Sequence, residues 1–372
     1  MFIILLASFI ALFLTILDSS KILKNGMMSA FILVTFIACI RYDVGNDYMS
    51  YKYDFERVGR YSLSFIFSEH DNLKDYDSLF KDVGAVTLFR ILHPLGFPVF
   101  AALVSIFQGC VFYQFIKENV SRGNYWVAIF IYLFNFDFFV LPMSMIRQGL
   151  VISMFVWSWH FIRQNKYLIP IIITIIGISL HKSSIIVFPF LFVKFLPYSK
   201  GKLIAAILLS VCLLFIVASG ILNSLYSGMM ELEAFKMYAG YEEDGGSKMG
   251  FVRKFLAYMP FLLALLYIIN PKFNVNNKAL ITLSIVGTII IPFTSIVQLI
   301  SRLCYYFNVF AIAAIPVSMY SISNKLIRYS LLTVILLILF YQYIDIFQNS
   351  VYTKSFMEYH TLWSNLDFLY GK

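Results

Sequence analysis

Four short polar stretches interrupt an otherwise apolar chain, and each holds at least one cation. They are centred on Arg41, Arg147, the pair His181 and Lys182, and Arg302. A guanidinium at the start of a helix can form two parallel hydrogen bonds to an oxyanion, and the helix dipole strengthens the attraction. These residue types therefore suit the binding of a phosphate or diphosphate group.

The first stretch, residues 41–51, is the most polar of the four. It follows directly on the apolar run 27–40 and contains one Arg, two Asp and three Tyr in eleven residues. A bilayer accepts such polar density only at its surface or in a watery cavity. Gly45 and Asn46 permit a turn, so we expect a helix near 47–60 that lies outside the hydrocarbon.

The elements that position these residues are membrane helices. The chain has 372 residues, of which 60% are hydrophobic and 13% charged, and its mean hydropathy is +0.80. We predict an all-α, polytopic membrane protein with about 12 transmembrane helices in a single domain over 1–372. The predicted spans are 2–17, 27–40, 97–116, 124–141, 145–162, 167–180, 183–196, 203–221, 255–270, 279–300, 303–322 and 328–347.

Two of these spans need comment. The first, 2–17, lacks a basic flank and a small-residue cleavage site, so it is expected to be a retained helix and not a signal peptide. Span 183–196 reaches only about 20 Å and contains Pro189, so we expect it to be broken or partly re-entrant.

Composition excludes several classes of function. The net charge of +9 does not indicate nucleic-acid binding, because the basic residues are scattered singly between apolar runs. The four Cys lie in or beside apolar runs without a CxxC pair, which predicts neither disulfides nor a zinc site. The chain has no Walker A, dinucleotide-binding or HExxH motif. We therefore expect no metal and no cofactor.

The connections between spans predict the orientation of the chain. One set is short and carries thirteen Lys or Arg against two acids, and the positive-inside rule places it in the cytoplasm. Both termini and the two longer loops, 41–96 and 222–252, then lie outside. We expect an amphipathic, interfacial helix at 83–96 and a flexible loop at 222–252.

With this topology, all four polar stretches lie on the outer side of the membrane. The positive-inside rule disfavours cations there, so their gathering favours a functional role. The alternative is that each arginine anchors lipid headgroups and that His181 is an interfacial histidine satisfied by its neighbours.

The four stretches together resemble a known family. The pattern Arg41-Tyr-Asp-Val-Gly-Asn-Asp47-Tyr48-x-x-Tyr51 resembles the signature of EpsG-like, Wzy-type polysaccharide polymerases. The later stretches resemble other parts of that family in the same order, and they read Ile146-Arg147-Gln148, His181-Lys182-Ser183 and Ser301-Arg302-x-x-Tyr305-Tyr306. The resemblance covers about 41–310.

The resemblance implies a multi-pass glycosyltransferase of the bacterial cytoplasmic (inner) membrane, compatible with a GT-C-like architecture. Such an enzyme polymerises undecaprenyl-diphosphate-linked oligosaccharide repeat units on the outer face, as donor and acceptor, into O-antigen, capsule or exopolysaccharide. The resemblance also implies that the enzyme needs no metal ion and that it acts together with a flippase and a chain-length regulator.

The resemblance also implies roles for the polar residues. A diphosphate leaving group needs cations, and an acceptor hydroxyl needs a base. The catalytic candidates are Asp47, His181, Arg147 and Arg302, and the substrate-binding candidates are Arg41, Asp43, Tyr48, Tyr51, Gln148, Lys182, Tyr305 and Tyr306. Asp47 is the preferred base, because Arg41 and Tyr51 can orient it and nothing in the sequence fixes the tautomer of His181.

Two other functions remain open. A lipid-linked oligosaccharide flippase or other transporter would suit twelve spans, although it should place charges near the midplane and show related halves. A ligase that moves a finished chain to another acceptor would share the same diphosphate site.

Overall fold

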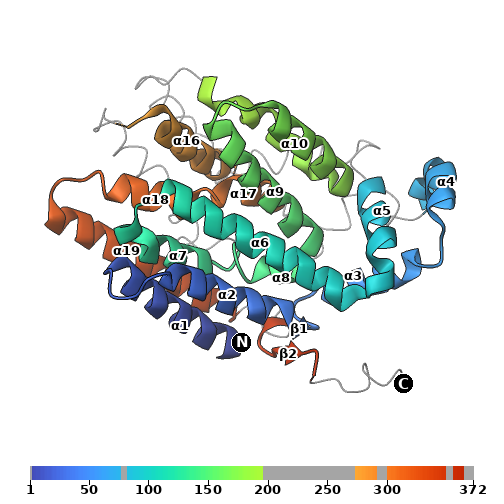
Figure 1. Cartoon of the computed structure of the whole chain (residues 1–372), viewed down its shortest axis with the longest axis horizontal. Coiled ribbons are helices and arrows are strands. Elements are labelled where there is room, and N and C mark those ends of the chain that lie inside the picture. The colour runs from blue at the N-terminus through green and yellow to red at the C-terminus, as the bar shows by residue number, and fades with distance from the viewer. Residues whose placement is uncertain (1, 77–81, 196–272, 291–299, 349–354, 364–372) are drawn as a thin grey trace, which may run out of the picture. The chain divides into compact units, whose positions relative to one another are not determined.

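A computed structural model of the chain describes residues 2–76, 82–195, 273–290, 300–348 and 355–363 (Figure 1). It falls into two compact units, one made of Met1–Leu191 with Ile335–Lys372 and the other of Phe192–Val334. The described residues are mostly helical, as predicted. The expectation of one membrane domain over 1–372 stays a prediction.

Apolar helices form the body of the first unit. Its long helices are α1 (Phe2–Ser19), α2 (Gly26–Cys39), α6 (Phe97–Asn119), α9 (Ile146–Arg163) and α10 (Leu168–Leu180). Each packs against the next in the order α1, α2, α6, α9 and α10, and they run side by side (Figure 1). Small residues allow close approach, since a Cβ at Gly109 of α6 would clash with Thr35 of α2.

The predicted number of spans is only partly supported. Within the described residues, three helices are long and apolar enough to cross a membrane, and they are α1, α6 and α19 (Lys325–Ile346). A fourth is reached if the bent pair α17 (Ile300–Asn308) and α18 (Ala311–Met319) forms one span. Twelve spans stay a prediction, and the predicted spans 203–221 and 255–270 lie outside the described residues.

Two predicted spans are not single straight helices in the structure. Span 124–141 stops early, because α7 (Tyr125–Leu133) ends before a turn in which Asn135 accepts a hydrogen bond from the Asp137 N–H at 3.0 Å. The short α8 (Leu141–Ser144) then precedes α9. Span 303–322 is bent by 42° between α17 and α18. A hydropathy averaged over a long stretch of sequence does not detect such local turns.

Span 183–196 is irregular, as its length and Pro189 indicated. Residues Lys182–Phe195 form the 3-10 helix η4, with a non-helical residue at Phe192. Proline removes a backbone donor, which disfavours a regular α-helix here.

The described part of the loop 41–96 is mostly helical and packs against other elements of the first unit (Figure 1). The expected helices near 47–60 and 83–96 are present as α3 (Tyr48–Val58), α5 (Val83–Leu92) and the 3-10 helix η2 (His93–Leu95). The helix α4 (Leu63–Tyr76) was not predicted. Buried aromatic rings join these elements to α6, with Phe55 of α3 in contact with Phe89 of α5 and Phe100 of α6.

A two-stranded sheet, which the all-α prediction did not include, holds the polar stretch at 41–51. β1 (Arg41–Tyr42) pairs antiparallel with β2 (His360–Thr361). The Gly45 N–H donates to the Ser355 carbonyl at 2.9 Å. A segment more than 300 residues away in the chain therefore helps to fix the geometry of this stretch.

The second unit contains the third arginine stretch. Its described helices include α16 (Val275–Ile290), α17 and α18, and α16 packs against both of the others. A Cβ at Gly287 of α16 would clash with Asn308 at the end of α17, which explains the close packing. The predicted loop 222–252 lies outside the described residues.

Connections that the topology prediction puts on one side of the membrane are neighbours in the first unit. At one end, Arg122 Nε lies 2.7 Å from Asp18 Oδ1. At the other end, Arg147 at the start of α9 lies 3.3 Å from Asp82 in the loop 41–96. The cytoplasmic or outer identity of each end stays a prediction.

Candidate functional site

An ionic cluster joins three elements at the first turn of α9. Arg147 Nη1 lies 3.3 Å from Asp82 Oδ2. The same carboxylate oxygen lies 3.9 Å from His181 Nδ1. Its other oxygen, Oδ1, accepts a hydrogen bond from the Lys182 backbone N–H at 3.3 Å. Asp82 therefore stands between the two catalytic candidates Arg147 and His181. We call Asp82, Arg147, His181 and Lys182 the Asp82 cluster.

Asp82 occupies the N-cap position of α5, yet its carboxylate does not cap that helix. An N-cap Asp ordinarily accepts a hydrogen bond from an N–H in the first turn of its own helix. Here the Asp82 backbone carbonyl accepts from the Ala85 N–H at 2.9 Å, and the side chain is directed to Arg147 and Lys182 instead.

The packing of α5 on α10 brings Asp82 to His181. A Cβ at Gly84 would clash with Ser179, so only glycine permits this approach of the two helices. His181 ends α10 in an extended conformation, and its N–H donates to the Gly177 carbonyl at 2.9 Å. Its backbone is therefore fixed at the junction of α10 and η4.

The ring of His181 and the guanidinium of Arg147 have unused donors and acceptors. Neither ring nitrogen of His181 has a hydrogen-bond partner among the described residues, although both are buried from solvent. The same holds for Arg147 Nε. Buried polar atoms are usually satisfied, so unsatisfied ones in a cluster of cations indicate a place for a polar ligand.

The polar stretch at 41–51 reaches this cluster from α3. The Arg147 guanidinium lies over the Tyr51 ring, with Cζ 5.3 Å from the ring centroid. One turn earlier, the Asp47 N–H donates to Ser144 Oγ at 3.0 Å, just before α9 begins. Asp47, Tyr51, Arg147 and His181 are therefore brought to one region of the first unit.

The charge of Asp82 is stabilised by its neighbours. Burial acts to raise the pKa of its carboxyl, but His181, Arg147 and the Lys182 N–H together lower the pKa below the ordinary value of 3.8. The carboxylate is therefore ionised at neutral pH, and it balances part of the positive charge of the site.

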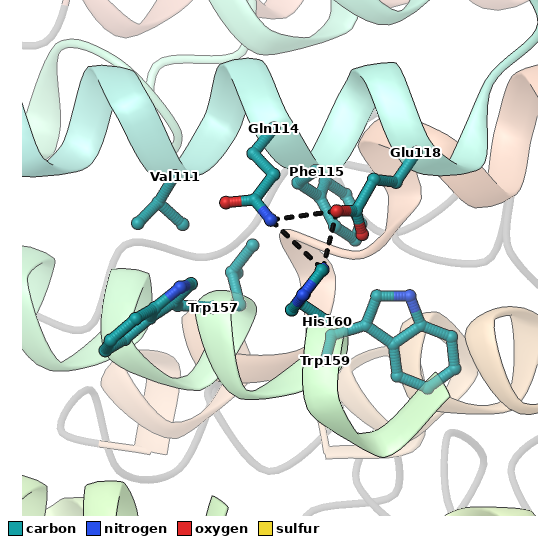
Figure 2. Close-up of a pocket in the computed structure, with 8 residues that line it drawn as sticks. Val111, Gln114, Phe115, Glu118, Trp157, Trp159 and His160 are labelled. Carbon is teal, nitrogen blue, oxygen red and sulfur yellow. Dashed lines mark hydrogen bonds and ion pairs between the residues drawn. The ribbon is translucent and has the colours of Figure 1, made fainter. Parts of the chain in front are cut away.

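A second cluster, at the opposite end of α9, also combines a carboxylate, a histidine and an arginine. Its carboxylate and both nitrogens of its imidazole bond to one another or to neighbouring side chains. Glu118 Oε1 lies 2.5 Å from His160 Nδ1, and Glu118 Oε2 lies 3.1 Å from Arg163 Nη1. Gln114 and Gln164 bond the carboxylate and the imidazole in turn. Figure 2 shows Gln114 and Glu118 on one helix facing His160 on another, around a small pocket.

The contrast between the two clusters separates a structural site from a candidate active site. Both nitrogens of His160 have a partner, whereas those of His181 have none among the described residues. The Glu118 cluster ties α6 to α9, while the Asp82 cluster keeps donors and acceptors for a ligand.

The profile of the EpsG family matches residues 24–361, nearly the whole chain, and this stretch contains every residue of the Asp82 cluster. The chain belongs to the EpsG family. The EpsG family is similar to Wzy-type polymerases. Membership of it indicates a membrane protein of the polysaccharide polymerase type with glycosyltransferase-like activity. Comparison with curated proteins and with solved structures gives no match.

Arg41 of this EpsG-family protein is built into the interior. Its side chain donates to the Met143 carbonyl from Nε at 3.0 Å, to Ser105 Oγ from Nη1 at 2.7 Å, and to the Ala38 carbonyl. It is 2% exposed. The guanidinium thus joins α2, α6 and α8, which is not the role of orienting Asp47 that the sequence suggested.

The other candidates of the first unit differ in accessibility. Tyr48 is fully buried and its hydroxyl donates to the Arg41 carbonyl at 3.2 Å. Gln148 is also buried. Asp43 is exposed, with a left-handed φ of 50°. The side chain of Lys182 is exposed, and only its backbone N–H is bonded to Asp82.

The remaining candidates belong to the second unit. Arg302, Tyr305 and Tyr306 all lie on α17, with Arg302 and Tyr305 half-buried and Tyr306 fully buried. Their predicted roles stay predictions.

Asp82 is the residue that sequence reasoning missed. A single signal pointed to it, namely an Asp directly before the apolar segment Val83–Leu92, which is a common helix start. Within the described residues, no group of three or more His, Cys, Asp and Glu is placed to hold a metal ion.

Proposed function

We propose that the chain is a membrane glycosyltransferase that polymerises undecaprenyl-diphosphate-linked oligosaccharide repeat units on the outer face of the cytoplasmic membrane. The family supports polymer formation, and Arg147 carries the argument for a diphosphate leaving group. Its guanidinium is held at the start of α9 by Asp82 and Tyr51, with Nε left without a partner among the described residues. Such an arrangement suits an oxyanion.

The reaction needs two functions from the protein, a cation that stabilises the leaving group and a base that takes a proton. A hydroxyl at the sugar terminus of the incoming repeat unit attacks the anomeric carbon of the growing chain. The bond from that carbon to the diphosphate oxygen breaks, and undecaprenyl diphosphate leaves with the electron pair. Arg147, with Arg302 as the second candidate, stabilises the charge that develops on the diphosphate. A base takes the hydroxyl proton. Direct displacement inverts the anomeric centre.

The site offers two candidates for the base, Asp47 and His181. Both come to the region of Arg147, through Ser144 and through Asp82 respectively. No nucleotide is needed, because the lipid diphosphate is itself the activated donor.

Deletion of the gene tests this proposal against its rivals. We expect surface polysaccharide that carries a single repeat unit, which restored wild-type protein extends to long chains on a gel. Long lipid-linked chains that stay unattached would indicate a ligase. Repeat units that accumulate in the cytoplasm would indicate a flippase or other transporter.

A further inference from the structure

Asp82 lies beside one nitrogen of the His181 ring, as a carboxylate does in many pairs of a carboxylate and a catalytic histidine. Its Oδ2 lies 3.9 Å from Nδ1, on one side of the ring. This distance is longer than a hydrogen bond, as is common for catalytic pairs before the substrate binds. The opposite nitrogen, Nε2, has no hydrogen-bond partner among the described residues.

We infer that Asp82 is a positioning residue that directs the Nδ1–H of His181 toward its carboxylate and leaves Nε2 to accept the proton of the acceptor hydroxyl. This inference rests on the proposed function, and it names His181 as the base. A neighbouring carboxylate sets which ring nitrogen carries the hydrogen and stabilises the imidazolium that forms.

Three observations separate this role from simple packing. The Asp82 carboxylate is turned away from the helix that it would ordinarily cap. It also accepts from the Lys182 N–H and from Arg147, which fixes its oxygens from two directions. The glycine at 84 lets α5 approach α10 closely enough for the pair to meet.

The same carboxylate links proton transfer to diphosphate binding. It uses one nitrogen of Arg147 and so fixes the plane of the guanidinium, while other donors of that group stay available for a diphosphate oxygen. The base and the cation are therefore held at a set separation by a single residue.

The test compares carboxylate variants in purified protein. Wild type, Asp82→Asn, Asp82→Glu and His181→Gln are placed in liposomes with lipid-linked repeat units extracted from cells that lack the gene. Chain formation is measured against pH and substrate concentration. The matched control is Glu118→Gln, which removes the carboxylate from the closed His160 cluster at the other end of α9.

We expect Asp82→Asn to lower kcat about 10- to 100-fold, with a smaller change in KM. The charged groups of this cluster are Asp82 from α5, Arg147 from α9 and Lys182 beside His181. Because Asp82 is the negative one, its loss should move the acidic limb of the rate profile to lower pH. Asp82→Glu keeps the charge and should keep the limb in place, and Glu118→Gln should leave the limb unchanged.

The outcomes separate the inference from the proposed function. Active wild type with an unchanged rate in Asp82→Asn overturns the inference alone. So does a lower rate whose acidic limb does not move, since that indicates a structural role. Wild type that forms no chains from these repeat units overturns the proposed function and the inference with it.

Discussion

Arg147 and Tyr51, which are 96 residues apart in the chain, meet with the guanidinium 5.3 Å from the ring centroid. Tyr51 is on α3 and Arg147 is on α9, so this contact makes the polar stretch at 41–51 part of the Asp82 cluster. A cation over an aromatic face gains about 0.5–2 kcal/mol. The contact also restricts the rotation of the guanidinium, which favours a two-bond arrangement with an oxyanion.

The first prediction concerns this guanidinium. Arg147→Lys keeps the positive charge but loses the planar fork and its stacking on Tyr51, so it should lower polymerisation about a hundredfold, nearly as much as Arg147→Ala. Arg302→Lys should act similarly. The control is Arg163→Lys, which keeps the pair with Glu118 at the other end of α9. Full activity in both Arg147→Lys and Arg302→Lys would reduce these residues to headgroup anchors.

The second prediction concerns the side of the membrane on which the site lies. Ser68 belongs to the loop 41–96 and Ser247 to the loop 222–252, and both loops are predicted to lie outside. In a background without cysteine, Ser68→Cys and Ser247→Cys should therefore react with a membrane-impermeant thiol reagent in intact spheroplasts. Lys166→Cys, in an exposed connection near the basic end of α9, should react only after lysis. The reverse pattern would contradict the outer-face location of the site.

The third prediction concerns the turn that positions α3. Gly45 has a φ of 87°, and a Cβ there would clash with Ser144. Gly45→Ala should therefore destabilise the fold by about 1–3 kcal/mol and lower activity. Gly123→Ala is the control, because a Cβ at Gly123 meets nothing within 4 Å. Thermal unfolding in detergent compares them, and equal midpoints for both variants would refute the steric argument.

The fourth prediction concerns how the contribution of Asp82 to the stability of the fold depends on pH. The folded-state pKa of Asp82 lies below its ordinary 3.8, so its stabilising effect is present above about pH 3.8 and is lost only as pH falls through the lower folded value. Between pH 8 and 5, the unfolding midpoint of wild type should therefore stay above that of Asp82→Asn by at least as much as it does at pH 8, and any protonation of His181 beside the carboxylate can only widen this gap. A difference that shrinks across this range would show that Asp82 is not ionised throughout.

The hydropathy of the sequence was sufficient to predict the long apolar helices. The apolar runs gave α1, α6 and α19, and the interrupted run at 83–96 gave α5 with η2. Breaks set by local hydrogen bonds were missed, as at Asn135. The pairing of β1 with β2 joins distant segments of two residues each, which no periodicity reveals.

Arg147 and His181 of the Asp82 cluster could be singled out from the sequence, whereas their carboxylate partner Asp82 could not. Arg147 and His181 stood out because each interrupts an apolar run. Asp82 did not, because its partners are decided by how closely α5 packs on α10 and not by its neighbours in sequence. Arg41 shows the opposite case, since three oxygens from α2, α6 and the end of α8 accept its hydrogen bonds in the interior.

The last prediction concerns the choice between the two bases. From the sequence, Asp47 is the preferred base because Arg41 and Tyr51 lie near it in the chain and can orient it. In the structure the Arg41 guanidinium bonds to Met143, Ser105 and Ala38, and Tyr51 lies under Arg147. His181 instead has a carboxylate beside it. We therefore expect His181→Gln to lower the rate at least about a hundredfold, because a general base contributes that much or more.

Asp47→Asn keeps the backbone hydrogen bond to Ser144 and should retain the rate to within about tenfold. Both variants are assayed with lipid-linked repeat units in liposomes, after the binding of the substrate has been measured separately. An inactive Asp47→Asn beside an active His181→Gln would make Asp47 the base. Activity in both would mean that neither is the base, and that positioning together with stabilisation of the diphosphate by Arg147 carries the reaction.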